Sequence, residues 1–220
     1  MSTSVTRLAV FIPFSFGRGV ERVNVTLAQA LAARGVEVDV VAASAKGPYF
    51  DELNGKTRLV DLGVRKTAAS LPGLIGYLKR NRPKAMLSAP DSGSLVALWA
   101  RRLAGADCRS VVATHAVLSR SLEQKSWLNR TLFCSLLHRT YRHADAVVAV
   151  SEQAADDLAS LSRVPRADIQ VIANPVVTDE LERAAEESAG HPWFENSDLP
   201  VILSVGRLNK EKNYEALIDA

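Results

Sequence analysis

Short apolar segments of strand character alternate with amphipathic helical segments along most of the chain. The expected strands lie at residues 8–12, 36–42, 58–62, 85–88, 110–113, 146–150 and 169–172. The expected helices lie at 20–34, 71–80, 94–103, 126–142 and 152–161. Several of the strands are apolar on both faces, as buried parallel strands are. Strands joined through helices imply right-handed crossovers, so the pattern predicts an α/β fold with a doubly wound parallel sheet.

The last twenty residues predict the start of a second domain. We expect the first domain to cover residues 1–187, a Gly- and Pro-bearing linker to cover 188–200, and the second domain to begin at 201. Residues 201–205 have strand character, a Gly-Arg turn follows, and residues 216–218 have the apolar spacing of a helix. Such a turn brings cations and free backbone N–H groups together, which suits a phosphate or diphosphate.

Composition sets the class of protein. Hydrophobic residues make up 47% and charged residues 23% of the 220 residues, which is ordinary for a soluble globular protein. We see neither a membrane-spanning run nor a signal peptide. Cys108 and Cys134 make no disulfide framework, and no Cys/His spacing resembles a metal site. We therefore expect a cytoplasmic protein that needs no metal or other cofactor.

Charge is segregated along the chain. Residues 63–143 carry 14 basic and three acidic side chains, whereas residues 144–220 carry six basic and 15 acidic ones. Segregation of this kind suggests a face that meets anions, although helices solvated by Lys and Arg explain it equally well. Nucleic acid is not expected as a partner, because no recognition module accompanies the charge.

The helix expected at 126–142 mixes Trp127, leucines and a phenylalanine with arginines, and Lys125 stands directly before it. Two interpretations remain open. We prefer a core helix with a basic exposed side. The alternative is a helix that docks on anionic lipid headgroups, which would make the protein peripheral at the inner face of the membrane.

The loop after the first strand, residues 13–19, is the first candidate binding site. In doubly wound sheets ligands bind beyond the carboxyl ends of the strands. Gly17 and Gly19 would let a ligand approach the backbone, and the start of the next helix favours an anionic group. The loop is not G-x-G-x-x-G, so a nicotinamide cofactor is not expected. The alternative is a glycine turn without a function.

Four segments together resemble a known family. Residues 19–41, 144–151, 171–176 and 204–212 resemble, in the family's order, the retaining GT-B glycosyltransferases of the glycosyltransferase family 4 group. The resemblance implies a Rossmann-like N-terminal domain on the acceptor side, followed by the first strand and helix of the nucleotide-sugar-binding domain. It also implies a hexosyltransferase that moves a sugar from a nucleotide-sugar to an acceptor hydroxyl, with retention and without an essential metal. The acceptor would be a sugar, a lipid-linked molecule or another hydroxyl compound.

The resemblance also implies roles for individual residues. Arg207 and Lys212 match the pair that holds the donor diphosphate, and Gly19 matches the glycine whose N–H faces the donor phosphate. His115 matches a histidine at the end of the fifth strand, near the transferred sugar, and is the expected catalytic residue. The family's glutamate pair would lie in a region that this chain does not include, so we expect the chain to be incomplete and inactive alone.

Four further residues are candidates for the acceptor or the cleft. The family usually has a Gly-Gly pair in the first loop, whereas Arg18 stands before Gly19 here. Gly17 and Arg18 could meet an acceptor anion, or Arg18 could point to solvent. Ser151 and Asn174 stand at strand ends, where they either line the cleft or cap helices, and capping is preferred.

Two other functions remain as alternatives. A nucleotide-sugar epimerase of the same architecture would need carboxylates that act as acid and base in the cleft, and we see no candidate pair. A stand-alone module that binds anions or docks on a membrane surface is the second alternative.

Overall fold

The computed structural model describes residues 7–195, 200–206, 208 and 212–220. The chain divides into two compact units, the first ending at Val176 and the second beginning at Val177. This division comes before the expected linker at 188–200, and the helix at Asp179–Ala185 already belongs to the second unit.

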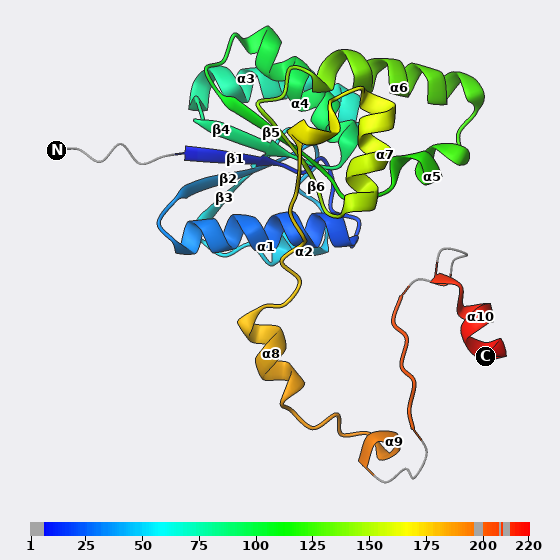
Figure 1. The fold of residues 1–220 in the computed structure, drawn as a ribbon. Coiled ribbons are helices and arrows are strands. Elements are labelled where there is room, and N and C mark those ends of the chain that lie inside the picture. Colours follow the sequence, from blue (N-terminus) through cyan, green and yellow to red (C-terminus); the bar gives the residue numbers. More distant parts are fainter. Residues whose placement is uncertain (1–6, 196–199, 207, 209–211) are drawn as a thin grey trace. The chain divides into compact units, whose positions relative to one another are not determined.

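The first unit is built on one seven-stranded sheet with the order β3-β2-β1-β4-β5-β6-β7. All neighbouring strands are parallel, as predicted. Figure 1 shows the sheet with helices on both sides. The strands are β1 (Arg7–Phe11), β2 (Glu37–Ala42), β3 (Thr57–Asp61), β4 (Ala85–Ser88), β5 (Arg109–Thr114), β6 (Ala146–Ala149) and β7 (Ile169–Val171).

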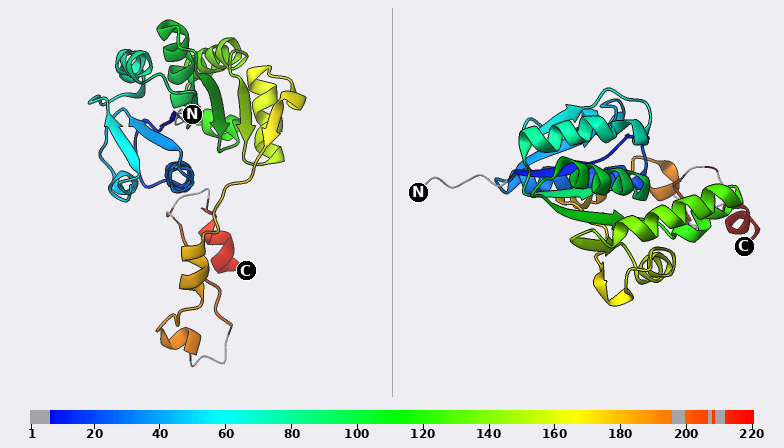
Figure 2. Two further views of the ribbon diagram at one scale, coloured as in Figure 1. Left: turned by 90° about the vertical axis from the view of Figure 1, so that its left-hand side faces the viewer. Right: turned by 90° about the horizontal axis from the view of Figure 1, so that it is seen from above.

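Helices cover the two faces of the sheet unequally. One face is covered by α1 (Gly19–Ala33) and α2 (Pro48–Asp51), which pack with Val10 and Val40. The other face is covered by α3 (Leu71–Asn81), α4 (Asp91–Ala104), α6 (Trp127–Tyr141) and α7 (Glu152–Ser162). Figure 2 shows this arrangement from two further directions. The doubly wound fold predicted from the sequence is therefore confirmed.

The remaining elements are short. They are η1 (Thr67–Ser70), α5 (Leu118–Glu123), η2 (Arg166–Asp168), α8 (Asp179–Ala185), α9 (Pro192–Glu195) and α10 (Tyr214–Asp219). The helix expected at 216–218 is present as α10, whereas the expected strand at 201–205 is not formed. A strand is held by its pairing with a neighbour, and these residues pair with no strand in the part of the chain that is described. No helix within the described ranges is long and apolar enough to cross a membrane.

A buried polar network joins the carboxyl end of the sheet to two helices. The Thr114 hydroxyl, at the end of β5, and the Tyr141 hydroxyl, at the end of α6, both donate to Asp91 Oδ1, at 2.6 and 2.8 Å. All three side chains are buried. Burial raises the pKa of Asp91, and the two hydrogen bonds oppose the shift. The network fixes the start of α4 and the residue that precedes His115.

Replacing Asp91 should therefore destabilise the first unit. Asp91→Ala leaves two buried hydroxyls without their acceptor, at about 1–3 kcal/mol each, so we expect a loss of about 2–6 kcal/mol in the free energy of unfolding. Asp91→Asn keeps an oxygen at the acceptor position and should lose clearly less. Urea unfolding of the three proteins tests this, and equal losses for the two variants would contradict it.

Candidate functional site

The first turn of α1 and the end of β5 meet through one amide side chain. Asn24 Nδ2 donates to the carbonyl of Val20 at 2.7 Å and lies 3.5 Å from Nε2 of His115. The short bond to a carbonyl fixes which end of the amide is the nitrogen. The structure thus brings His115 to the same place as the beginning of α1, where Gly19 stands.

The contact with Asn24 assigns the tautomer of a neutral His115 ring. The second N–H of the Asn24 amide points at Nε2, so Nε2 accepts and the proton of a neutral ring lies on Nδ1. Nδ1 is buried, and within the described residues it has no hydrogen-bond partner. Burial lowers the pKa of His115, and the nearby side chain of Asn174 opposes this shift. A neutral ring with an unused N–H is suited to donate a hydrogen bond to a ligand oxygen.

The loop between β1 and α1 is held by a buried carboxylate. Glu21 is 2% exposed, and its Oε2 accepts from the backbone N–H groups of Phe16 at 3.1 Å and Arg18 at 2.6 Å. These bonds satisfy two backbone donors that would otherwise need water. Glu21 therefore fixes the path of the chain directly before Gly19.

Gly93 and Gly47 allow two other segments of the chain to pack closely on the loop between β1 and α1. A Cβ at Gly93, in the first turn of α4, would lie 2.8 Å from Pro13 Cγ. A Cβ at Gly47, where φ is +137°, would lie 2.1 Å from the carbonyl oxygen of Ser15. Larger residues at either position would displace the loop, so the loop is held from both sides.

Gly19 is the first residue of α1, and its N–H meets no acceptor in the described structure. A Cβ at Gly19 would meet nothing within 4 Å, so the space beside the helix start is open. Gly17, two residues earlier, has a φ of +76°, which favours glycine. Free N–H groups at a helix start attract anions, so the geometry fits the predicted phosphate contact of Gly19, which stays a prediction.

Arg18 lies at the surface beside exposed aromatic rings. Its guanidinium carbon is 5.1 Å from the centre of the Phe16 ring, which in turn stacks on Phe14 at 5.3 Å. Phe16 is 64% exposed. The side chain of Arg18 is therefore accessible to an acceptor anion or to solvent, and neither role is tested.

The other predicted site residues are placed as follows. Ser151 accepts from the N–H of Ala154 at 3.2 Å, so its side chain caps α7 as preferred. Asn174 is half-buried near His115. Lys212 is exposed in the second unit, and Arg207 lies outside the described residues. The diphosphate-binding role of both cations stays a prediction.

Sequence reasoning missed Glu21 and Asn24. A carboxylate in the first turn of a helix is a known capping signal, so Glu21 could have been found. Asn24 could have been found only by placing it four residues after Val20, on one face of the helix. Nowhere in the described ranges do three or more His, Cys, Asp and Glu side chains gather in a way that could hold a metal ion.

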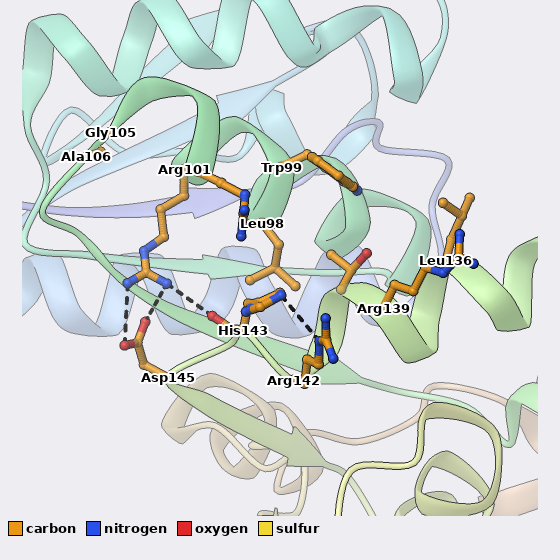
Figure 3. A pocket seen from close by; sticks show the side chains of 12 residues that line it. Leu98, Trp99, Arg101, Gly105, Ala106, Leu136, Arg139, Arg142, His143 and Asp145 are labelled. Carbon is orange, nitrogen blue, oxygen red and sulfur yellow. Dashed lines mark hydrogen bonds and ion pairs between the residues drawn. The ribbon is translucent and has the colours of Figure 1, made fainter.

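An open groove of about 920 Å³ lies elsewhere, between α4 and α6 (Figure 3). It is lined by the C-terminal parts of both helices, including Arg101, Arg139 and His143. These parts lead into the beginnings of β5 and β6, so the groove is at the amino edge of the sheet. The candidate site around His115 is at the carboxyl edge.

Comparisons with known proteins agree with this fold. The family model for Glycosyltransferase Family 4 matches residues 17–180, which is more than half of the chain. The chain belongs to glycosyltransferase family 4. It has the fold of the N-terminal domain of GT-B glycosyltransferases. A comparison with curated proteins gives no match.

Three solved structures illustrate the likeness. Anabaena HepE in complex with UDP-glucose is 15% identical with a TM-score of 0.58, over 76% of this chain and 43% of that one. A glycosyltransferase from Rickettsia africae is 16% identical with a TM-score of 0.62, over 98% and 56%. A proposed UDP-N-acetylglucosamine 2-epimerase from Listeria monocytogenes is 15% identical with a TM-score of 0.55, over 86% and 50%. At these identities the likeness shows the fold alone, and the chain spans about half the length of each protein.

The lowered pKa of His115 predicts a pH dependence of stability. The unfolded ring binds a proton near pH 6.5, and the folded ring binds it only at lower pH, so stability should fall as the pH falls through about 6.5. His115→Asn cannot take up this proton and should lose that part of the dependence. Urea unfolding of both proteins at pH 7.5 and 5.5 measures it, and parallel pH profiles would show that the assignment is wrong.

Proposed function

We propose that this chain is the acceptor-side part of a retaining glycosyltransferase, which moves a sugar from a nucleotide-sugar to an acceptor hydroxyl. The observation that carries the proposal is the link from Val20 through Asn24 to His115. This link brings a free helix start and an unused imidazole N–H to one edge of the sheet. The first group suits a donor phosphate, and the second suits a sugar hydroxyl.

The named ligands of similar structures support the class of donor. HepE was solved with UDP-glucose, and MnaA from S. aureus was solved with UDP. UDP-glucose is therefore the first donor to test. The acceptor class stays open among sugars, lipid-linked molecules and other hydroxyl compounds.

The reaction breaks the bond between the sugar C1 and the donor diphosphate and forms a bond from C1 to the acceptor oxygen, which loses its proton. Negative charge develops on the diphosphate as it leaves. The N–H of Gly19, together with Arg207 and Lys212, would stabilise that charge without a metal. Neutral His115 would hold the transferred sugar through Nδ1–H. We place the reaction in the cytoplasm.

A structural neighbour that is a proposed epimerase favours the epimerase alternative. It would need a free acid and a free base near the sugar. Two buried carboxylates near the carboxyl edge, Glu21 and Asp91, already accept two hydrogen bonds each. Because both carboxylates are already occupied by hydrogen bonds, sugar transfer is favoured over epimerisation. Nuclear magnetic resonance of UDP-sugar incubated without an acceptor distinguishes the two, because an epimerase would change the sugar and keep the UDP-sugar bond.

The donor contact of Gly19 can be tested without disturbing the fold. Gly19 is the first residue of α1, where proline is tolerated, and Arg18 has the extended backbone that a following proline requires. Gly19→Pro removes the N–H, and Gly19→Ala keeps it and fills open space. In the full-length protein, Gly19→Pro should weaken UDP-glucose binding about 10- to 150-fold, as for a hydrogen bond to a charged group, and Gly19→Ala should not. Isothermal titration calorimetry measures both, and equal affinities would remove Gly19 from the donor site.

Transfer should also continue in the presence of EDTA. Side-chain cations and backbone N–H groups, rather than a divalent ion, are proposed to stabilise the leaving diphosphate. The release of UDP from UDP-glucose in the presence of an acceptor measures the rate. A rate that EDTA abolishes and Mn²⁺ restores would show that the proposal of metal-free transfer is wrong.

A further inference from the structure

The first half of α6 is exposed, although it carries large apolar side chains. Trp127 is 77%, Leu128 66% and Leu132 60% exposed, and in Figure 1 this end of α6 extends beyond the sheet. The buried residues of the helix, Leu137 and Tyr141 among them, lie in its second half. The preferred interpretation of a core helix therefore fits only that second half.

The exposed apolar residues continue from α6 to α4. Leu128, Leu132 and Leu136 recur every four residues and so lie along one side of α6. Leu136 and Trp99 of α4 line the same groove, and Leu103 follows Trp99 by four residues and is 55% exposed. The α4–α6 face is defined by these five residues together with Trp127, Arg102 and Arg139.

The rim of this face is basic. Arg101, Arg102, Arg139 and Arg142 line the groove, and Figure 3 shows Arg101 pointing to Asp145. That ion pair measures 3.0 Å. The other three arginines form no ion pair with a carboxylate in the described part of the chain. The face thus combines projecting leucines and tryptophans with guanidinium groups that lack an anion.

We propose that the α4–α6 face docks on a membrane surface that contains anionic phospholipids. Leucines enter the boundary of the acyl chains, tryptophan rings suit the membrane interface, and guanidinium groups bind lipid phosphates with paired N–H groups. A second copy of the chain fits less well, because a symmetric contact would bring like-charged arginines together. The proposal does not depend on the proposed sugar transfer.

Co-sedimentation with vesicles tests the docking directly. One set of vesicles is phosphatidylcholine alone, and the other contains equal parts of phosphatidylcholine and phosphatidylglycerol. The protein should bind the mixed vesicles, bind phosphatidylcholine far less, and lose binding as salt is raised. Equal binding to both vesicles, or none to either, would overturn the proposal.

Matched variants locate the surface. Arg102→Gln with Arg139→Gln should weaken binding about 25-fold, or about fivefold for each charge. Leu128→Gln with Leu132→Gln should also abolish most of the vesicle binding. Because both leucines are exposed, the fold should persist in this variant. Arg34→Gln with Lys56→Gln is the control, because it removes two exposed cations that flank α1 and β3. Equal loss in the control and in the arginine pair would show only general attraction and would refute the site.

Tryptophan fluorescence provides a second measurement. The chain has three tryptophans, and Trp193→Phe leaves Trp99 and Trp127, both on the proposed face. Their emission should shift to shorter wavelength with mixed vesicles. The proposal fails if the emission stays unchanged, or if light scattering shows a dimer that the leucine pair of substitutions dissociates.

Discussion

The amide of Asn24 connects the two parts of the structure on which any chemistry at this edge depends. One N–H holds the carbonyl of Val20, and the other points at His115. Asn24 is 2% exposed, so water does not compete strongly for either contact. Because α1 is packed on one part of the sheet and His115 directly follows β5, this single side chain links the helix start to the imidazole.

The topology explains why the site forms at this point. From β1 the chain proceeds to β2 and β3 in one direction, then returns past β1 to β4 and continues to β7. Loops after β1 and β4 therefore leave the sheet toward opposite faces, and ligands bind at such a switch point. The loop at residues 13–19 follows β1. Gly93, which follows β4, packs against Pro13 of this loop. Right-handed crossovers also place α1 and α2 on one face and α3, α4, α6 and α7 on the other.

Much of the fold could be predicted because apolar periodicity is a local property. The seven strands of the sheet were found within one or two residues at their ends. The short helices α2 and α5 were missed because four to six residues carry too little periodicity. The strand at 201–205 was predicted from apolar character, but a strand needs a partner. Leu128 and Leu132 cannot be told from core leucines in the sequence. Only the packing shows that nothing in their own unit covers them. Glu21 was missed because its role depends on two N–H groups that only the folded loop directs at it.

The position of Glu21 has a consequence for how far the loop before α1 can vary. The carboxyl group of Glu21, behind the start of α1, satisfies two backbone donors at once. The N–H groups of Phe16 and Arg18 are thereby occupied, whereas the N–H of Gly19 meets no acceptor in the described structure. A side chain of another length at residue 21 would therefore free two backbone donors and change the path of the chain before Gly19, and not only the charge beside the helix.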